Sequence, residues 1–83
     1  MVKLNNVTIS YLKVLDYDGK YYGFTVDIVV MENYIEAWLR ICTYGVSELM
    51  FGTDDFEYDD FIQIVEKNFD EYAIQYVEKY AKE

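Results

Sequence analysis

The sequence predicts an α+β fold, in which a four-stranded antiparallel β-meander precedes one long C-terminal helix packed on one face of the sheet (ββββα). In the first half of the chain, apolar residues alternate with the others at a period of two, which is typical of strands with one buried face. From residue 54 onward, large apolar residues recur at steps of three and four, which is typical of one side of an α-helix. We expect a single domain over residues 1–83, because a chain this short has room for one core and no linker-like segment interrupts it.

The expected strands cover about residues 7–15, 21–31, 34–43 and 47–52. Turn lengths determine how such strands pair, because residues directly opposite in an antiparallel pair share a face of the sheet. The alternation is clearest in the second strand, whose apolar face consists of Tyr22, Phe24, Val26, Ile28 and Val30.

The first hairpin is expected to close through a two-residue turn at Asp18 and Gly19. This turn places Ile9 opposite Ile28, and the large apolar side chains of the first two strands then share one face. Lys13 interrupts that face, and we expect its aliphatic stem to carry the ammonium group out from under the sheet.

The next two turns are expected at Glu32 and Asn33 and at residues 44–46, where Gly45 would adopt a positive φ. Together they extend the same apolar face across all four strands. The predicted pairs are Val30 with Ile35, Ile28 with Ala37, Val26 with Leu39, Phe24 with Ile41, Ile41 with Leu49, and Leu39 with Phe51.

The helix is expected over about residues 55–81. Asp54, followed three residues later by Glu57, resembles a capping box, and acidic residues in the first turn complement the positive end of a helix. The apolar stripe of the helix consists of Tyr58, Ile62, Val65, Phe69, Tyr72, Tyr76 and Tyr80.

Composition excludes several classes of function. The chain has 16 Asp and Glu against 7 Lys and Arg, a formal net charge of −9, and this argues against direct binding to nucleic acid, which needs cations for the phosphates. There is no His, so catalytic triads and metal sites that use His are excluded, and no glycine-rich phosphate loop occurs. We therefore expect a protein that is not an enzyme, with no catalytic residues, no metal site and no cofactor.

Cellular location is inferred from equally simple features. Cys42 is the single cysteine, so no disulfide can form within the chain, which fits a reducing compartment. The longest apolar run is far shorter than the ~18 residues of a membrane span, and the N-terminus lacks an apolar signal segment. We expect a cytoplasmic protein that does not enter the membrane.

An acidic surface is the first candidate site, because residues 54–60 contain five acids. Residues 54–83 carry a net charge of −7 and residues 1–53 a net charge of −2, so the negative field is concentrated on the helical half. The expected partner is a basic protein, and we consider a host protein whose nucleic-acid site the acids would occupy by imitating phosphates. The alternative interpretation is a solvated helix face whose acids only complement the helix dipole. The residues of this acidic surface are Asp54, Asp55, Glu57, Asp59, Asp60, Asp70, Glu71 and Glu78.

The sheet face away from the helix is the second candidate site. It is expected to display apolar side chains together with Trp and Arg, the residue types enriched at the centres of interfaces, so it could form a homodimer or bind a partner. The alternative is that Trp38 only covers the backbone at Gly23. The residues of this second sheet face are Val29, Trp38, Arg40, Cys42 and Met50.

Residues 34–39 (YIEAWL), residues 44–52 (YGVSELMFG) and the acidic, Tyr-rich helix make the chain similar to short uncharacterised proteins of Firmicutes and of their phages and mobile elements. In size and charge it also resembles anti-CRISPR proteins, many of which are small acidic inhibitors that occlude the nucleic-acid site of a nuclease. This second resemblance implies an inhibitory function and a nucleic-acid-binding partner.

The leading hypothesis is therefore a non-catalytic binding or inhibitory module of a phage or mobile element, which uses its acidic surface on a basic host protein. The alternative hypothesis is a housekeeping interaction module, or a homodimer built on the second sheet face, without any mimicry of nucleic acid.

Overall fold

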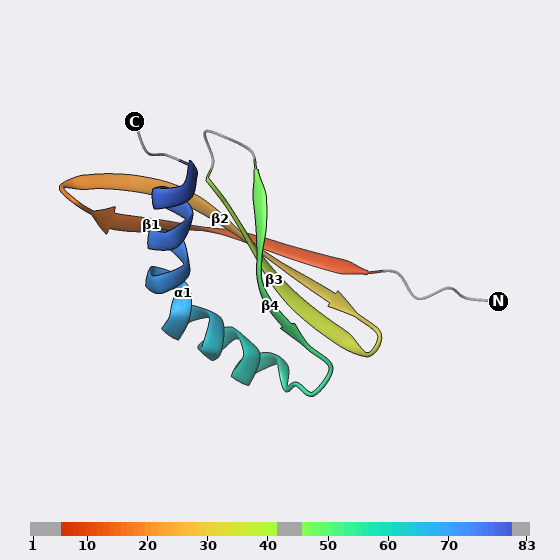
Figure 1. Ribbon diagram of the computed structural model, residues 1–83. Coiled ribbons are helices and arrows are strands. Elements are labelled where there is room, and N and C mark those ends of the chain that lie inside the picture. The colour runs from red at the N-terminus through yellow and green to blue at the C-terminus, as the bar shows by residue number, and fades with distance from the viewer. Residues whose placement is uncertain (1–5, 42–45, 81–83) are drawn as a thin grey trace.

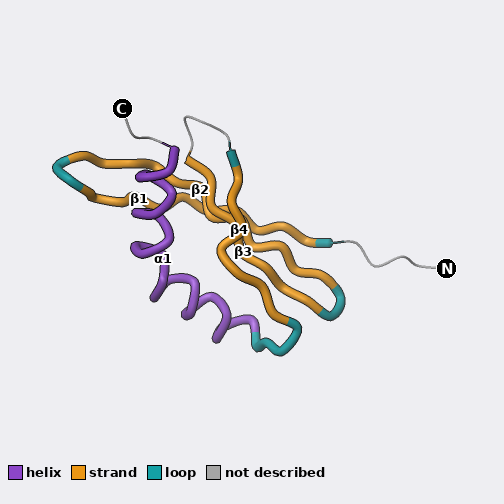
Figure 2. The backbone as a smooth tube through the Cα atoms, in the orientation of Figure 1, coloured by secondary structure: helices purple, strands orange, loops and turns teal. Residues whose placement is uncertain are grey.

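The computed structural model describes residues 6–41 and 46–80 (Figures 1 and 2). One antiparallel sheet has the strand order β1-β2-β3-β4, and a single helix follows it in the chain, so the predicted α+β class is confirmed. The elements are β1 (Val7–Tyr17), β2 (Lys20–Met31), β3 (Tyr34–Ile41), β4 (Ser47–Thr53) and α1 (Tyr58–Tyr80).

The arrangement leaves the sheet covered on one side only. Figure 1 shows a strongly twisted sheet, with α1 starting beside the end of β4 and rising along one face towards the β1–β2 hairpin. The first half of β1 projects past the helix. Within residues 6–41 and 46–80, no helix combines the length and the apolarity that crossing a membrane requires.

The first two hairpins have the predicted registers. Asp18 and Gly19 both have positive φ values, 56° and 77°, as a two-residue turn between twisted strands requires. Ile9 lies opposite Ile28, and Ile28 lies opposite Ala37, so the alternating apolar residues of three strands do share one face.

The predicted register of the third hairpin is wrong. We expected Leu39 opposite Phe51, whereas Phe51 lies opposite Ala37 and Leu39 lies opposite Glu48. The register is already shifted by three residues at Leu39, and an odd shift exchanges the two faces of β4. A β-bulge opposite Ala37 and Trp38 then adds one residue to β4, so that Phe51 pairs with Ala37. The expected positive φ of Gly45 concerns a residue outside the described part of the chain.

The shifted register and the bulge together change which side chains of β4 face the helix. Met50 is buried with 7% of its surface exposed, whereas Leu49, which we expected in the core, is 49% exposed. Two consecutive residues, Met50 and Phe51, can therefore both pack under α1. A regular strand would have sent one of them to the other face.

The start of α1 also differs from the prediction. The helix begins at Tyr58, and the carbonyl of Glu57 accepts the first helical hydrogen bond, from Phe61 N–H at 2.9 Å. Asp54 is thus not the capping residue. The chain turns beforehand at Thr53, whose Oγ1 accepts a hydrogen bond from the Asp55 N–H at 3.1 Å.

The core lies between α1 and the helix-facing side of the sheet. Phe24 is fully buried at its centre, with its ring 5.6 Å from Phe69 and 5.5 Å from Tyr76, both in edge-to-face geometry. The buried apolar residues are Leu15, Phe24, Val26, Ile28, Ile35, Ala37, Leu39, Ile41, Met50, Phe61, Val65, Phe69, Ala73, Tyr76 and Val77.

We predict that Phe24→Ala lowers the free energy of unfolding by about 3–5 kcal/mol, because it removes a large buried ring and leaves a cavity. Tyr21→Ala, in the same strand but largely exposed, should cost no more than about 1 kcal/mol. Urea unfolding followed by circular dichroism measures both variants. Equal losses would contradict the central position of Phe24.

Candidate binding surfaces

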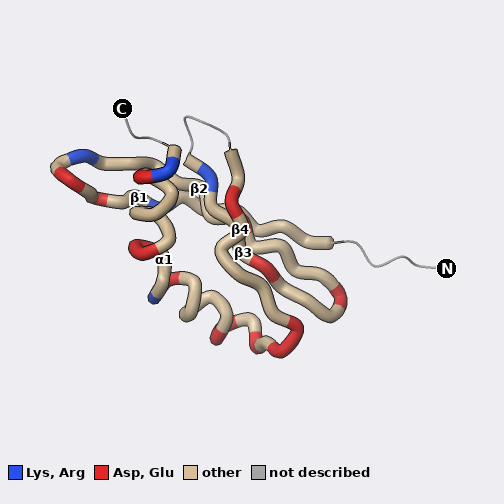
Figure 3. Tube along the Cα trace, viewed as in Figure 1, with Lys and Arg blue, Asp and Glu red and all other residues tan. Residues whose placement is uncertain are grey.

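The acids before and at the start of α1 form an exposed group. Asp54, Asp55, Glu57, Asp59 and Asp60 are all exposed, and Figure 3 shows them around the β4–α1 connection. In the described part of the chain, none of the five forms an ion pair with Lys or Arg. Their charges are therefore not neutralised by that part of the fold.

Helix capping accounts for only some of this charge. Asp59 and Asp60 lie in the first turn of α1, where they complement the helix dipole. Asp54 and Asp55 precede the helix, and the dipole acts mainly within the first turn. The alternative that the acids merely serve the helix therefore leaves these two unexplained.

A shallow cavity of about 440 Å³ opens among these acids. Phe56, Phe61 and Ile64 contribute apolar surface to it, and Ile64 is exposed although it is a large aliphatic residue on a helix. The remaining lining residues are Thr53, Asp55, Glu57 and Asp60. The sequence analysis did not predict the apolar lining of this cavity. Two features of the sequence could have indicated it, namely Phe56 within the acidic run and Ile64 outside the predicted apolar stripe.

The other predicted acids extend along α1 away from this group. Asp70, Glu71 and Glu78 are all exposed. At 1.5 Å per residue, Asp70 lies about 15 Å and Glu78 about 27 Å further along the helix than Asp60. Glu78 also accepts a hydrogen bond from the Tyr17 hydroxyl of β1. The eight acids form a row with one dense end, and the last of them helps to hold the helix on the sheet.

The second sheet face differs from the prediction at Met50, which lies in the core because the register of β4 is shifted by an odd number of residues; Leu49 occupies this face instead, opposite Trp38. Val29 and Arg40 are half-buried in their strands. Cys42 lies outside the described residues.

Polar contacts hold the centre of the second sheet face. Asp27 accepts a hydrogen bond from the Ser10 hydroxyl at 2.6 Å and lies 3.9 Å from the Arg40 guanidinium. The Trp38 indole N–H donates to Glu36 at 2.8 Å, which fixes the ring near its own strand. Trp38 lies opposite Asp27, four residues and about 13 Å from Gly23, so it does not cover that glycine.

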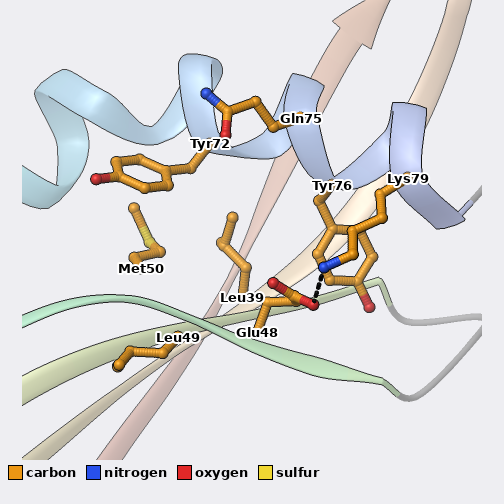
Figure 4. Close-up of a pocket in the computed structure, with 8 residues that line it drawn as sticks. All are labelled: Leu39, Glu48, Leu49, Met50, Tyr72, Gln75, Tyr76 and Lys79. Atoms are coloured by element: carbon orange, nitrogen blue, oxygen red, sulfur yellow. Dashed lines mark hydrogen bonds and ion pairs between the residues drawn. The ribbon is translucent and has the colours of Figure 1, made fainter.

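A smaller cavity of about 180 Å³ lies between α1 and β4 (Figure 4). Leu39, Met50 and Tyr72 give it an apolar surface. Its two charged residues, Glu48 and Lys79, pair with each other at 3.0 Å, as the dashed line in Figure 4 shows. The cavity therefore offers a small apolar space whose charged groups are already satisfied.

Carboxylates on both sides of the sheet–helix contact accept hydrogen bonds across it. Glu66 accepts from Lys13 Nζ at 2.6 Å and from the Tyr11 hydroxyl at 2.7 Å. These contacts, the Lys13 contact foremost, lower the pKa of Glu66, whereas burial and the neighbouring Glu66 raise the pKa of Tyr11. Lys13 also lies 5.0 Å from the centre of the Phe69 ring, so its charge is accommodated at the edge of the core.

Glu48 is held in the same way at the other end of the helix. It accepts hydrogen bonds from the Tyr80 hydroxyl and from Lys79, and these contacts lower the pKa of Glu48. Tyr76 donates nearby to the carbonyl of Val46. Carboxylates and tyrosine hydroxyls thus fasten α1 to β1 and β4.

Comparison of the chain with protein-family models, with curated proteins and with solved structures finds no match in any of the three. Among residues 6–41 and 46–80, no group of three or more Cys, Asp or Glu side chains is arranged to hold a metal ion.

We predict that Glu66→Gln destabilises the protein at neutral pH by no more than about 1 kcal/mol, the usual range for an exposed ion pair. Because the folded state lowers the pKa of Glu66 below the ordinary 4.5, the unfolded chain takes up this proton first as the pH falls. The stabilisation is present above that ordinary pKa and is lost as the pH falls through the folded pKa. The difference between wild type and variant should therefore shrink in acid.

Denaturant unfolding at a series of pH values measures this difference. Glu71→Gln is the matched control, because Glu71 is an exposed acid of the same helix that joins no ion pair within the described residues. A gap between wild type and Glu66→Gln that stays constant down to low pH would contradict the assigned role of the Lys13–Glu66 contact.

Proposed function

We propose that this protein is a non-catalytic binding module that attaches to a basic protein through the acids at the start of α1. The observation that carries the proposal is that the ion pairs of the described residues all involve acids outside residues 54–60. Of the five described Lys and Arg residues, three pair with carboxylates elsewhere, namely with Glu66, Asp27 and Glu48. The five acids of residues 54–60 form no ion pair with any of them.

The cavity beside these acids supports a basic side chain as the contact. Arg and Lys combine an apolar stem with a charged end. The stem would pack on Phe56, Phe61 and Ile64, and the charged end would reach the carboxylates of Asp55, Glu57 and Asp60. Arg suits such a site better than Lys, since its planar guanidinium can pair with two carboxylate oxygens at once.

The row of acids along α1 supports a basic surface as the wider partner. A nucleic-acid-binding protein offers a row of cations spaced for phosphates, and a negative field of this kind speeds its association. We propose that the module competes with nucleic acid for that surface. The resemblance to anti-CRISPR inhibitors in size and charge favours an inhibitory role in a host cell.

We predict that the protein binds an arginine-rich peptide of about ten residues at low salt and that binding weakens as salt rises, because paired surface charges are screened. The triple variant Asp55→Asn, Glu57→Gln and Asp60→Asn should lose roughly tenfold or more in affinity, which corresponds to about 1.4 kcal/mol. Fluorescence anisotropy of the labelled peptide measures both effects.

The matched control removes three exposed acids outside the acidic surface, with Asp16→Asn, Asp18→Asn and Glu32→Gln, so that the net charge is equal in the two variants. If both variants lose the same affinity, binding depends on net charge alone and the proposed site is wrong. A lysine-rich peptide of the same length tests the preference for Arg. Competition between this protein and a DNA oligonucleotide for a basic nucleic-acid-binding protein tests the inhibitory role.

A further inference from the structure

The exposed edge of β1 is unprotected in ways that the edge of β4 is not. β1 is 11 residues long, pairs with β2 without any register shift, and has no partner strand on its outer side within residues 6–41 and 46–80. Sheet edges are usually blocked by shortness, a bulge, Pro or an inward-pointing charge. β4, the other edge, has 7 residues and a bulge beside it, and its Glu48 reaches α1. Lys13 is the one charged residue of β1 whose side chain faces the helix, and it forms an ion pair with Glu66.

Large apolar side chains flank the β1 edge on both faces of the sheet. Leu12 and Val14 are 73% and 63% exposed on the face away from the helix. Val7 and Ile9 are exposed on the helix-facing side, where β1 projects past α1 (Figure 1). A strand added along this edge would therefore gain backbone hydrogen bonds and apolar contacts on both faces.

Charge indicates which strand this edge accepts. Residues 1–15 contain no Asp or Glu, although the chain as a whole has 16. A basic partner is attracted to the helical half and gains nothing at this edge. For a second copy of this strongly acidic chain, by contrast, β1 is the segment where two molecules can meet without opposing carboxylates.

We propose that two copies of this chain pair antiparallel through β1 and form a continuous eight-stranded sheet. Centring the pair on Ser10 keeps Asp16 out of the contact, sets Ile9 opposite Tyr11 of the second copy, and sets Thr8 opposite its Leu12. Opposite residues then share a face, as antiparallel pairing requires. In this dimer the two Lys13 residues, each paired with Glu66 of its own copy, would be about 20 Å apart along the strands. Each helix is about 10–12 Å wide, so the two helices would fit on the same face of the sheet.

Cysteine cross-linking tests this register. In a Cys42→Ser background, Ser10→Cys should give a disulfide-linked dimer under mild oxidation, because opposite Cα atoms in an antiparallel pair lie about 4.5–5.5 Å apart, within the disulfide range. Ser47→Cys, an equally exposed serine on the β4 edge, is the matched control and should not cross-link. Equal cross-linking at both positions would overturn the proposal.

Analytical ultracentrifugation of the full chain tests the interface itself. Wild type should be dimeric at micromolar concentrations, and Leu12→Lys should raise the dissociation constant roughly tenfold or more. Leu49→Lys, on the same sheet face beside the opposite edge, should leave it unchanged. A monomeric wild type, or a dimer disrupted by Leu49→Lys but not by Leu12→Lys, would overturn the proposal. Neither result depends on binding of a basic peptide, so the proposed function is tested separately.

Discussion

Phe24 lies where the sheet and α1 meet, edge-on to Phe69 and Tyr76, and the rest of the structure depends on this contact. The described part of this 83-residue chain has one helix with which to cover a four-stranded sheet. Burying the helix-facing side creates the core, because large side chains gain most from removal from water. It also leaves the opposite face, one full edge and the outer side of the helix to solvent.

The same contact determines which carboxylates form ion pairs with the two lysines beside it. Lys13 and Lys79 lie at the margins of the sheet–helix contact, where Glu66 and Glu48 accept their hydrogen bonds. Tyrosine hydroxyls share these carboxylates, so polar groups surround the apolar centre and fasten the helix at both ends. Cations that serve the fold in this way are not free to neutralise acids elsewhere. Within the described part of the chain, the acids at the start of α1 join no ion pair, and the proposed attachment to a basic protein rests on this charge.

The two edges of the sheet are also unequal because of the helix. At β4, Met50 and Phe51 both pack beneath α1, and the bulge that allows this interrupts the regular ladder. At β1, the helix covers only the second half of the strand, so a regular ladder continues into solvent. The proposed binding surface at the helix start and the proposed dimer edge at β1 lie on different elements. One copy could therefore use both at once.

The sequence by itself determined the α+β class, the first two registers and the exposure of the acids. These depend on local features: the Asp18-Gly19 turn fixes a register by its length, and hydrophobic period fixes which side of each element is buried. The sequence also placed Val65, Phe69 and Tyr76 correctly on the buried side of α1, but the predicted stripe included the exposed Tyr58 and omitted the buried Phe61, Ala73 and Val77. Only the tertiary structure decided that Met50 lies in the core, that Phe56 and Ile64 share a cavity with acids, and that Lys13 meets Glu66. The position of Met50 depends on how β4 pairs with β3, the Lys13–Glu66 pair on how the helix lies on a strand distant in sequence, and the cavity on how residues 53–64 pack together at the turn into α1. The pairing of β3 with β4 shows the limit most clearly, because a three-residue shift in register moved Met50 from the predicted outer face into the core.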